Sequence, residues 1–341
     1  MLKLGVLDQS PVLSGGDAVQ ALRNTLELAK LADRLGYSRF WVSEHHNAPG
    51  LAGSSPEVLM AAVGAHTSRI RIGSGGVLLP HYSPYKVAEN FRILEGLYPG
   101  RVDLGIGRAP GGMPLVSRAM GRVDGKDKED GFIDSLRELG AHLGTGPALD
   151  GSHPLAGLTA TPSVRTRPEP WLLGSSSHSA QVASALGAGF AFAHFINGQG
   201  GQSAAREYRR RFRPGPLGTA PRVTACVFVV CMDSDREAEL EAAALDLRLL
   251  LNDKGDFGQP VPGREDARRY PYNAYDRARI AENRNRMIVG GPERVGRMLS
   301  ALAASYGADE MIVNCITADA KSRFACYERL AAIFLNRSMR S

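Results

Sequence analysis

The chain has few cysteines, and their spacing excludes the common metal-finger and disulfide frameworks. Cys226, Cys231, Cys315 and Cys326 are the only four in 341 residues, and they form no CxxC pair. We therefore expect reduced thiols, as in a cytoplasmic protein. Cys226 and Cys231 lie an odd number of positions apart on a predicted strand, so their side chains should face opposite sides of the sheet.

Long apolar runs and a strong charge imbalance are also missing. The N-terminal sequence MLKLGVLDQS leads directly into a predicted strand rather than a signal peptide. No apolar run reaches the roughly twenty residues that a membrane helix needs. The net charge is only +6, and the arginines are spread over the predicted helices. We expect a cytoplasmic protein that binds neither nucleic acid nor membranes.

No glycine fingerprint of the form GxGxxG follows the first predicted strand, which argues against an open dinucleotide-binding sheet. What the sequence does contain is a regular alternation of strands and helices, repeated eight times without a break in composition. Alternation of this kind predicts a parallel sheet, and eight units favour a closed (β/α)8 barrel. We therefore expect one α/β domain over residues 1–341. The predicted strands are 2–8, 40–42, 70–73, 102–106, 171–173, 189–195, 222–232 and 310–315.

Two neighbouring predicted strands end in glycine. The strand 70–73 is followed by Ser74, Gly75 and Gly76, and the strand 102–106 by Gly107 and Arg108. A ligand can lie directly on glycine backbone because no Cβ atom holds it away. The guanidinium of Arg108 adds a permanent charge that suits a phosphate. We interpret these strand ends as the floor of a cofactor site.

A third strand end is rich in hydroxyl groups and precedes a predicted helix. Free N–H groups, hydroxyl donors and the positive end of a helix dipole together favour an anion. An ordinary N-cap serine is the alternative interpretation. Three consecutive serines, with Arg108 at another strand end, favour phosphate. The residues of this stretch are Gly174, Ser175, Ser176, Ser177 and His178.

Two histidines, His45 and His46, follow Glu44 at the end of the second strand. Neighbouring side chains of an extended strand point in opposite directions, and the other strand ends carry few carboxylates, so we expect no metal site. One histidine acting as an acid, a base or a polarising group is favoured. A structural, hydrogen-bonded histidine is the alternative, and the same choice applies to His178 and His194.

Residues 252–285 form a long polar stretch that contains three prolines and precedes the last βα unit. Segments of this length without a clear pattern are usually functional lids or disordered excursions. We expect a mobile lid or insertion here.

Five motifs in order along nearly the whole chain resemble the bacterial luciferase-like flavin monooxygenases. The motifs are VSEHHN, RIGSGGVLLP, PGRVDLGIGRAPGG, LLGSSSHSAQVA and VGGPERV. The similarity is strongest to the subgroup that carries GIGRAPG, which includes an oxygenase of mensacarcin polyketide biosynthesis. The resemblance implies a (β/α)8 TIM barrel of the luciferase-like type, a homodimer, and FMN or the deazaflavin F420 at the barrel mouth.

The resemblance also implies roles for individual residues. It implies a cis peptide bond between Gly75 and Gly76 beneath the isoalloxazine ring, and a phosphate pocket formed by Arg108 and residues 175–177. His45 matches the catalytic histidine near the flavin C4a atom, and residues 252–285 match a mobile loop. Gly107 stands where luciferase has a reactive cysteine, so nothing is inferred from that thiol, and light emission is not expected.

The reaction implied by the resemblance is a monooxygenation. A separate flavin reductase would supply FMNH2, which would react with O2 through a C4a-hydroperoxide to oxygenate an organic substrate such as an aromatic polyketide. The alternatives are an F420-dependent dehydrogenase or reductase on the same barrel, a non-catalytic flavin-binding protein, and a barrel enzyme acting on a sugar phosphate. The sequence does not name the substrate.

Overall fold

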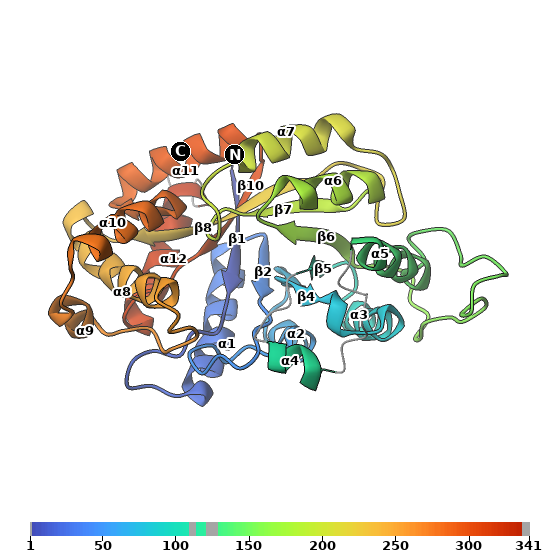
Figure 1. Cartoon of the computed structure of the whole chain (residues 1–341), viewed down its shortest axis with the longest axis horizontal. Coiled ribbons are helices and arrows are strands. Elements are labelled where there is room, and N and C mark those ends of the chain that lie inside the picture. Colours follow the sequence, from blue (N-terminus) through green and yellow to red (C-terminus); the bar gives the residue numbers. More distant parts are fainter. Residues whose placement is uncertain (1, 109–113, 121–128, 336–341) are drawn as a thin grey trace.

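A computed structural model describes residues 2–108, 114–120 and 129–335, and these residues form a closed parallel barrel surrounded by helices (Figure 1). Strand β10 pairs with β1 on one side and with β8 on the other, which closes the barrel. The predicted (β/α)8 barrel is therefore confirmed. Its strands are β1 (Lys3–Asp8), β2 (Arg39–Val42), β3 (Arg71–Ser74), β5 (Val102–Gly107), β6 (Glu169–Gly174), β7 (Gly189–Ala193), β8 (Val223–Cys231) and β10 (Glu310–Asn314).

The helices between the strands begin and end at residues that the sequence marks. The first helix begins after Asp17, whose side chain accepts a hydrogen bond from the Gln20 N–H at 2.7 Å, and ends at Gly36 with φ of 85°. The next two begin with a proline directly after a serine. The helices on the barrel are α1 (Ala18–Leu35), α2 (Pro56–His66), α3 (Pro84–Leu97), α5 (Glu129–Leu143), α6 (Ser177–Leu186), α7 (Gly201–Arg211), α8 (Asp235–Asp253), α11 (Pro292–Tyr306) and α12 (Ala320–Phe334).

The core of the barrel has two layers, and a third, smaller apolar cluster lies between α8 and α9 (Arg264–Arg269). A small cluster that includes Leu7, Trp41, Trp171 and Cys226 is separate from the large cluster between the strands and the helices, which includes Cys231. The two cysteines therefore lie in different layers, as their odd spacing predicts. All four cysteines are free and buried. No helix in the described part of the chain is long and apolar enough to cross a bilayer.

Several short elements were not predicted. Strand β4 (Val77–Leu78) pairs with the end of β5, and β9 (Met287–Gly290) pairs with the second half of β8. The polar stretch 252–285, expected to lack a regular pattern, contains two helices. The additional helices and 3-10 turns are η1 (Leu79–His81), α4 (Pro114–Ala119), α9 (Arg264–Arg269), α10 (Ala274–Asn283) and η2 (Arg284–Arg286). In Figure 1, α8, α9 and α10 lie together at the opposite end of the molecule from α3 and α5.

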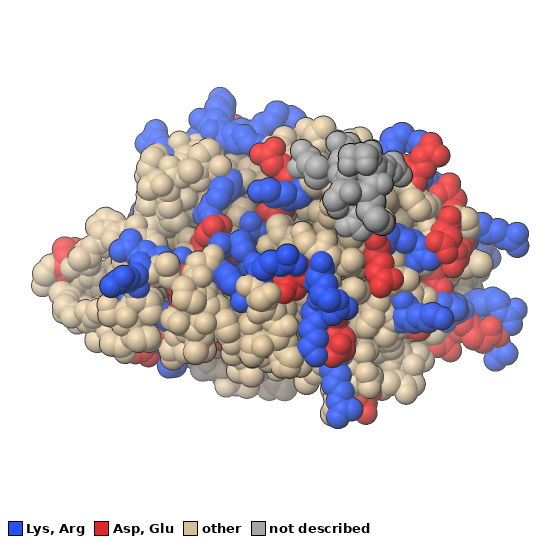
Figure 2. All heavy atoms as spheres, turned by 180° about the vertical axis from the view of Figure 1, so that it is seen from behind, with Lys and Arg blue, Asp and Glu red and all other residues tan. Residues whose placement is uncertain are grey.

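Charged side chains are mixed on the surface. On the face shown in Figure 2, basic side chains are spread out and many lie beside acidic ones. Pairs one helical turn apart, such as Arg210 with Glu207 at 2.6 Å and Arg137 with Asp134 at 3.0 Å, contribute to this mixing. The arginines are distributed as the sequence indicates.

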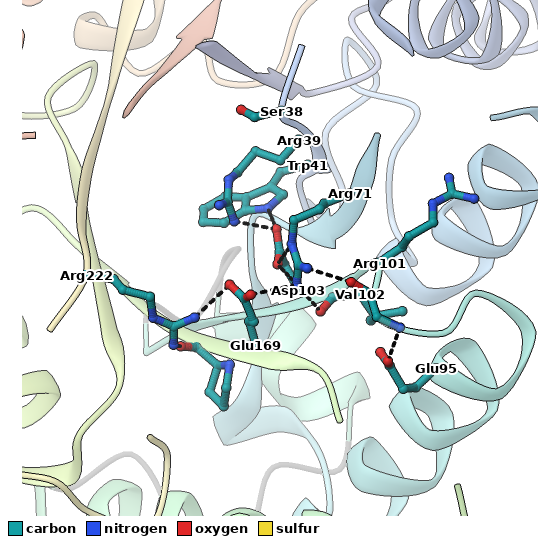
Figure 3. Close-up of polar contacts among 12 residues, drawn as sticks. Ser38, Arg39, Trp41, Arg71, Glu95, Arg101, Val102, Asp103, Glu169 and Arg222 are labelled. Atoms are coloured by element: carbon teal, nitrogen blue, oxygen red, sulfur yellow. Dashed lines mark hydrogen bonds and ion pairs between the residues drawn. The ribbon is translucent and has the colours of Figure 1, made fainter. Parts of the chain in front are cut away.

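The amino-terminal ends of the strands are joined by a buried ionic network around Asp103 (Figure 3). The fully buried Asp103 carboxylate accepts hydrogen bonds from Arg39 Nη1 at 2.6 Å, Trp41 Nε1 at 2.8 Å and Arg71 Nε at 2.8 Å. Arg39 also donates to Glu310 at 2.9 Å. The network therefore connects β2, β3, β5 and β10 at one end of the barrel.

The charges of this network depend on one another. Burial alone would lower the pKa of the Arg39 guanidinium, but the carboxylates of Asp103 and Glu310 raise it above its ordinary value. Removing one member of such a network leaves the other charges buried without compensation, which is usually more costly than never having had them.

We predict that Asp103→Asn lowers the free energy of unfolding by about 3–5 kcal/mol, because Arg39 stays buried with a weaker partner. Urea unfolding followed by circular dichroism measures this loss. The matched control is Asp134→Asn, which breaks an exposed pair with Arg137 and should leave the unfolding midpoint unchanged. Equal effects of the two substitutions would contradict the role given to the buried network.

Candidate functional site

The predicted site residues lie at the carboxyl ends of four strands that are neighbours in the barrel, β2, β3, β5 and β6. Ile106 of β5 pairs with Leu172 of β6. Arg108 and Gly174 each follow their paired residue by two positions, so the register places them level at the barrel mouth. Residues 109–113, which hold the rest of the GIGRAPGG motif, lie outside the described residues.

The glycine-rich floor is tightly packed. The peptide bond between Gly75 and Gly76 is cis, as the resemblance predicts. A Cβ atom on Gly76 would lie 2.8 Å from the Gly105 carbonyl oxygen, and one on Gly105 would lie 2.0 Å from the Ser74 oxygen. Only glycine fits where these strand ends approach each other. Ser74 itself is fully buried, and its hydroxyl donates to the Gly105 carbonyl at 2.8 Å, so it joins two strand ends.

The serine stretch forms the start of α6, beside the end of β5. Ser176 is the N-cap residue, but its side chain makes no capping hydrogen bond, and both Ser176 and Ser177 are exposed. His178 lies in the first turn and is half-buried. Arg108 is exposed and has no ion pair with any residue that the structure describes. Hydroxyls, a helix N-terminus and a guanidinium make a donor set that suits a phosphate.

His45 is a neutral imidazole at ordinary pH. Its Nδ1 lies 3.1 Å from the Ser43 hydroxyl, and its backbone N–H donates to the Gly53 carbonyl at 2.9 Å. Burial, with a smaller contribution from the nearby charge of Arg248, lowers the pKa of His45 to about 4. A neutral imidazole has one ring nitrogen that can accept a proton and one N–H that can donate a hydrogen bond, so His45 can act in either way.

Glu44 has a role that the sequence analysis missed. This buried carboxylate accepts hydrogen bonds from the Leu78 N–H at 3.0 Å, the Tyr82 hydroxyl at 2.7 Å and His46 Nε2 at 2.8 Å. It fastens the end of β2 to the segment after the cis peptide. The two adjacent histidines thus differ in their partners, because His46 lies against Glu44 and His45 against the Ser43 hydroxyl. Nowhere in the described ranges do three His, Cys, Asp or Glu side chains gather as a metal site.

A cavity of about 510 Å³ lies at the barrel mouth, on the side of β1, β7, β8 and β10. Its walls are mostly apolar, with Phe195 and Phe228 from the barrel and Leu245 and Leu249 from α8. Among the predicted site residues, His45 alone lines it. His45 therefore lies between the glycine floor and this cavity. The remaining lining residues are Gln9, His46, Asn47, Ala48, Leu51, Ile196, Arg248, Asn252, Phe257, Gly258, Arg286 and Ile316.

The segment 252–285 covers one side of the cavity. Asn252, Phe257 and Gly258 line it directly. Backbone hydrogen bonds fasten the segment to the loop after β1, from the Val261 N–H to the Val12 carbonyl at 2.8 Å and from the Ser14 N–H to the Val261 carbonyl at 2.8 Å. Gly50 also hydrogen-bonds to Gly258. Residues 252–258 of the segment thus cover one side of the cavity, and the mobility of the segment stays a prediction.

Comparison with known sequences identifies the family. A model described as "Luciferase-like monooxygenase" matches residues 2–310. The chain is 50% identical over 334 residues to the uncharacterized protein YwcH of Bacillus subtilis (strain 168), which covers 98% of this chain and 99% of that one. It is 36% identical over 333 residues to the N-acetyl-S-alkylcysteine monooxygenase of the same organism, covering 97% of this chain and 98% of the other.

Comparison with solved structures agrees with this result. The crystal structure of apo-MsnO8 is similar with a TM-score of 0.88 and 39% identity, covering 98% of each chain. The oxygenating component of 3,6-diketocamphane monooxygenase from Pseudomonas putida, solved with FMN, has a TM-score of 0.69 at 20% identity over 97% of this chain and 96% of that one, and thus shares the fold. Together with the closed barrel, these similarities show that the chain belongs to the luciferase-like monooxygenase family and is an oxidoreductase.

Proposed function

We propose that this protein is a flavin-dependent monooxygenase that uses reduced FMN and O2 to oxygenate an organic substrate. The observation that supports this most is the arrangement of the barrel mouth. A phosphate-type donor set and a glycine floor lie on one side, a covered apolar cavity lies on the other, and His45 lies between them. An anionic, planar cofactor and an apolar substrate would meet at such a site.

Residues of this chain fit FMN at the first of these two sides. Arg108, the exposed hydroxyls of Ser176 and Ser177 and the start of α6 would hold the phosphate. The Gly75–Gly76 backbone, supported by Ser74, would lie against the ring. Bound reduced flavin supplies the electrons that activate O2, and a separate flavin reductase would deliver it, because no dinucleotide fingerprint follows the first strand.

His45 would accept a proton at the boundary between flavin and cavity. Its depressed pKa keeps Nε2 or Nδ1 free of an extra proton at neutral pH, and Ser43 orients the ring. Glu44 is a positioning residue, because it fixes the strand end that carries His45 without lining the cavity itself. The cover formed by residues 252–259 would exclude water from the reacting groups.

The names of the relatives support a proposal about the kind of substrate. One relative is named for N-acetyl-S-alkylcysteines, and another similar structure belongs to a Baeyer-Villiger monooxygenase. A compact organic molecule that accepts one oxygen atom is the proposed substrate class. We also propose that the protein is a homodimer, as the resemblance implies.

We predict that Arg108→Ala raises the Kd for FMN by roughly 10- to 100-fold, because a charged hydrogen-bonding partner of a phosphate is usually worth about 1.5–3 kcal/mol. Fluorescence quenching of FMN measures the affinity. Riboflavin lacks the phosphate, so its affinity should not change. Arg206→Ala, at an exposed position on α7, is the control and should bind FMN as the wild type does. Parallel losses for riboflavin and FMN would contradict the phosphate role.

We predict that His45 makes the fold more sensitive to acid. The folded chain resists protonation of His45 down to about pH 4, whereas the unfolded chain takes up the proton near pH 6.5. The contribution of His45 to the free energy of unfolding is therefore fully present above pH 6.5 and is lost as the pH falls toward 4.

Urea unfolding at pH 7.5 and pH 5 tests this dependence. His45→Asn should reduce the loss of stability between the two pH values by roughly 2 kcal/mol. The control His66→Asn changes an exposed residue and should keep the loss seen in the wild type. An unchanged loss in His45→Asn would show that His45 is protonated normally in the fold.

We predict that Gly50→Ala opens the cover of the cavity. A Cβ atom at position 50 would lie 1.9 Å from the Gln259 carbonyl oxygen, so the segment must move away. Hydrogen exchange measured by mass spectrometry should become faster in peptides spanning residues 252–263. Gly151→Ala, where a Cβ meets nothing within 4 Å, is the control. Unchanged exchange in Gly50→Ala would mean that the contact with Gly50 does not hold the cover.

A further inference from the structure

The polar lining of the cavity is cationic or neutral. Arg248 and Arg286 line it together with His45, and the other polar lining residues that the structure describes are His46 and uncharged amides, with no Asp or Glu among them. The rest of the wall is apolar. A cavity of this kind is suited to a molecule with an apolar body and a negative group.

Arg248 differs from the other buried arginines. Of the three arginines that are buried in the described part of the chain, Arg39 pairs with Asp103 and Glu310, and Arg323 pairs with Asp8 at 2.8 Å. Arg248 is only 7% exposed, yet no carboxylate in the described ranges lies within ion-pair distance of it. Among the described residues, its guanidinium has one hydrogen-bond partner, the Gln259 carbonyl, to which Nη1 donates at 2.6 Å. A guanidinium has five N–H donors, so the described residues satisfy only part of its capacity.

The acidic residues nearest in sequence on α8 are already paired. Asp246 accepts two hydrogen bonds from Arg284, each at 2.7 Å, and Asp253 accepts from Arg279 at 3.0 Å and from Asn283 at 2.9 Å. The second arginine of the cavity, Arg286, donates to the Ile196 carbonyl at 3.2 Å and to Asn283. Neither Asp246 nor Asp253 therefore neutralises the charge of Arg248.

Keeping a cation buried without a counterion costs stability. Burial lowers the pKa of Arg248 to about 10, and the charge of Arg248 adds to the burial that lowers the pKa of His45. The buried charge of Arg248 therefore does not stabilise the fold by itself. A bound anion would reverse this cost, because a buried charge is stabilised once it is paired and hydrogen-bonded.

We propose that the cavity binds an organic acid, with the carboxylate of the ligand on Arg248 and its apolar body against Phe195, Phe228 and Leu245. This inference rests on the proposed function, because it takes the cavity to be the substrate site. Arg248 is then a specificity-determining residue, and the site of oxygenation lies toward His45, which lines the same cavity. The cover segment contributes through Gln259, whose carbonyl orients the guanidinium.

The flavin phosphate is the other anion that could lie here. Arg108 and the start of α6 follow β5 and β6, whereas Arg248 lies on α8 beside β8. Separate donor sets at these two places favour two different anions. Measuring the affinity for FMN and the affinity for a carboxylic acid separately distinguishes the flavin phosphate from the carboxylate.

The experiment is isothermal titration of the purified full chain, without flavin, at pH 7.5 with matched probes. The probes are 4-phenylbutyrate and decanoate, each compared with its own amide. We expect each acid to bind at least tenfold more tightly than its amide, because only the acid forms charged hydrogen bonds to Arg248. Arg248→Gln should abolish this preference while leaving amide affinity within twofold, and Arg248→Lys should retain part of it. Arg236→Gln, an exposed arginine on α8, is the matched control and should retain all of it.

Equal affinity of the wild type for acid and amide, or no affinity for any of the four probes, would overturn the proposal. An acid preference that survives in Arg248→Gln would do so as well, since it would arise from another charge. The same variants are also titrated with FMN and riboflavin. If Arg248→Gln loses affinity for FMN but not for riboflavin, the anion at Arg248 is the flavin phosphate, and the proposal is overturned. The wild-type comparison needs no variant, so the test stands even if Arg248→Gln fails to fold. The acid and amide titrations contain no flavin and measure binding rather than turnover, so their result is independent of whether the protein is a monooxygenase.

Discussion

The buried pairing of Arg39 with Asp103 and Glu310 is the interaction on which the barrel most depends. Arg39 begins β2, Glu310 begins β10, and Asp103 lies near the start of β5, so one guanidinium joins three strands at the amino-terminal end. Arg71 and Trp41 complete the shell around Asp103. Because these groups are hidden from water, each is stabilising only while the others are in place. Closure of the barrel through β10 and the ionic network at its base therefore support each other.

The carboxyl end of the barrel is less regular than the amino-terminal end. The cis peptide at Gly75–Gly76, the close approach of Gly105 to Ser74 and the short strand β4 all lie at the carboxyl end. Glycine backbone at this end offers a surface to a ligand because no Cβ atom holds the ligand away. Glu44 is the buried charge that organises this end, as Asp103 organises the base. The mouth is thereby divided into a glycine and phosphate side and a cavity side, with His45 at the boundary.

Local signals in the sequence predicted the barrel, but they did not predict what distant segments do together. The local signals are strand ends followed by glycine, proline after serine, and the motifs around Arg108 and Ser177. The eight strands follow from these signals, and the cis peptide follows from the family resemblance. Helices α9 and α10 were missed because their sequences are short and polar. They are held by ion pairs such as Lys254 with Asp276 at 2.7 Å and by a small apolar cluster in which Ala267 packs with Leu247 and Leu250 of α8. Glu44 was seen but given no role, because its partners Leu78 and Tyr82 come from another βα unit.

Arg248 reads as an ordinary exposed position in LDLRLLLND. Its burial depends on Gln259 and the cover, which no local pattern encodes.

The central claim is that the barrel mouth binds reduced FMN and directs it toward O2. The most direct measurement is an anaerobic titration of the protein with FMNH2 and, separately, with reduced F420, each followed by a pulse of O2 in a stopped-flow spectrometer. We predict tight binding of FMNH2 and a transient near-ultraviolet absorbance band after the pulse, which Arg108→Ala should weaken. Binding of reduced F420 alone, without reaction with O2, would contradict the claim and indicate hydride transfer instead.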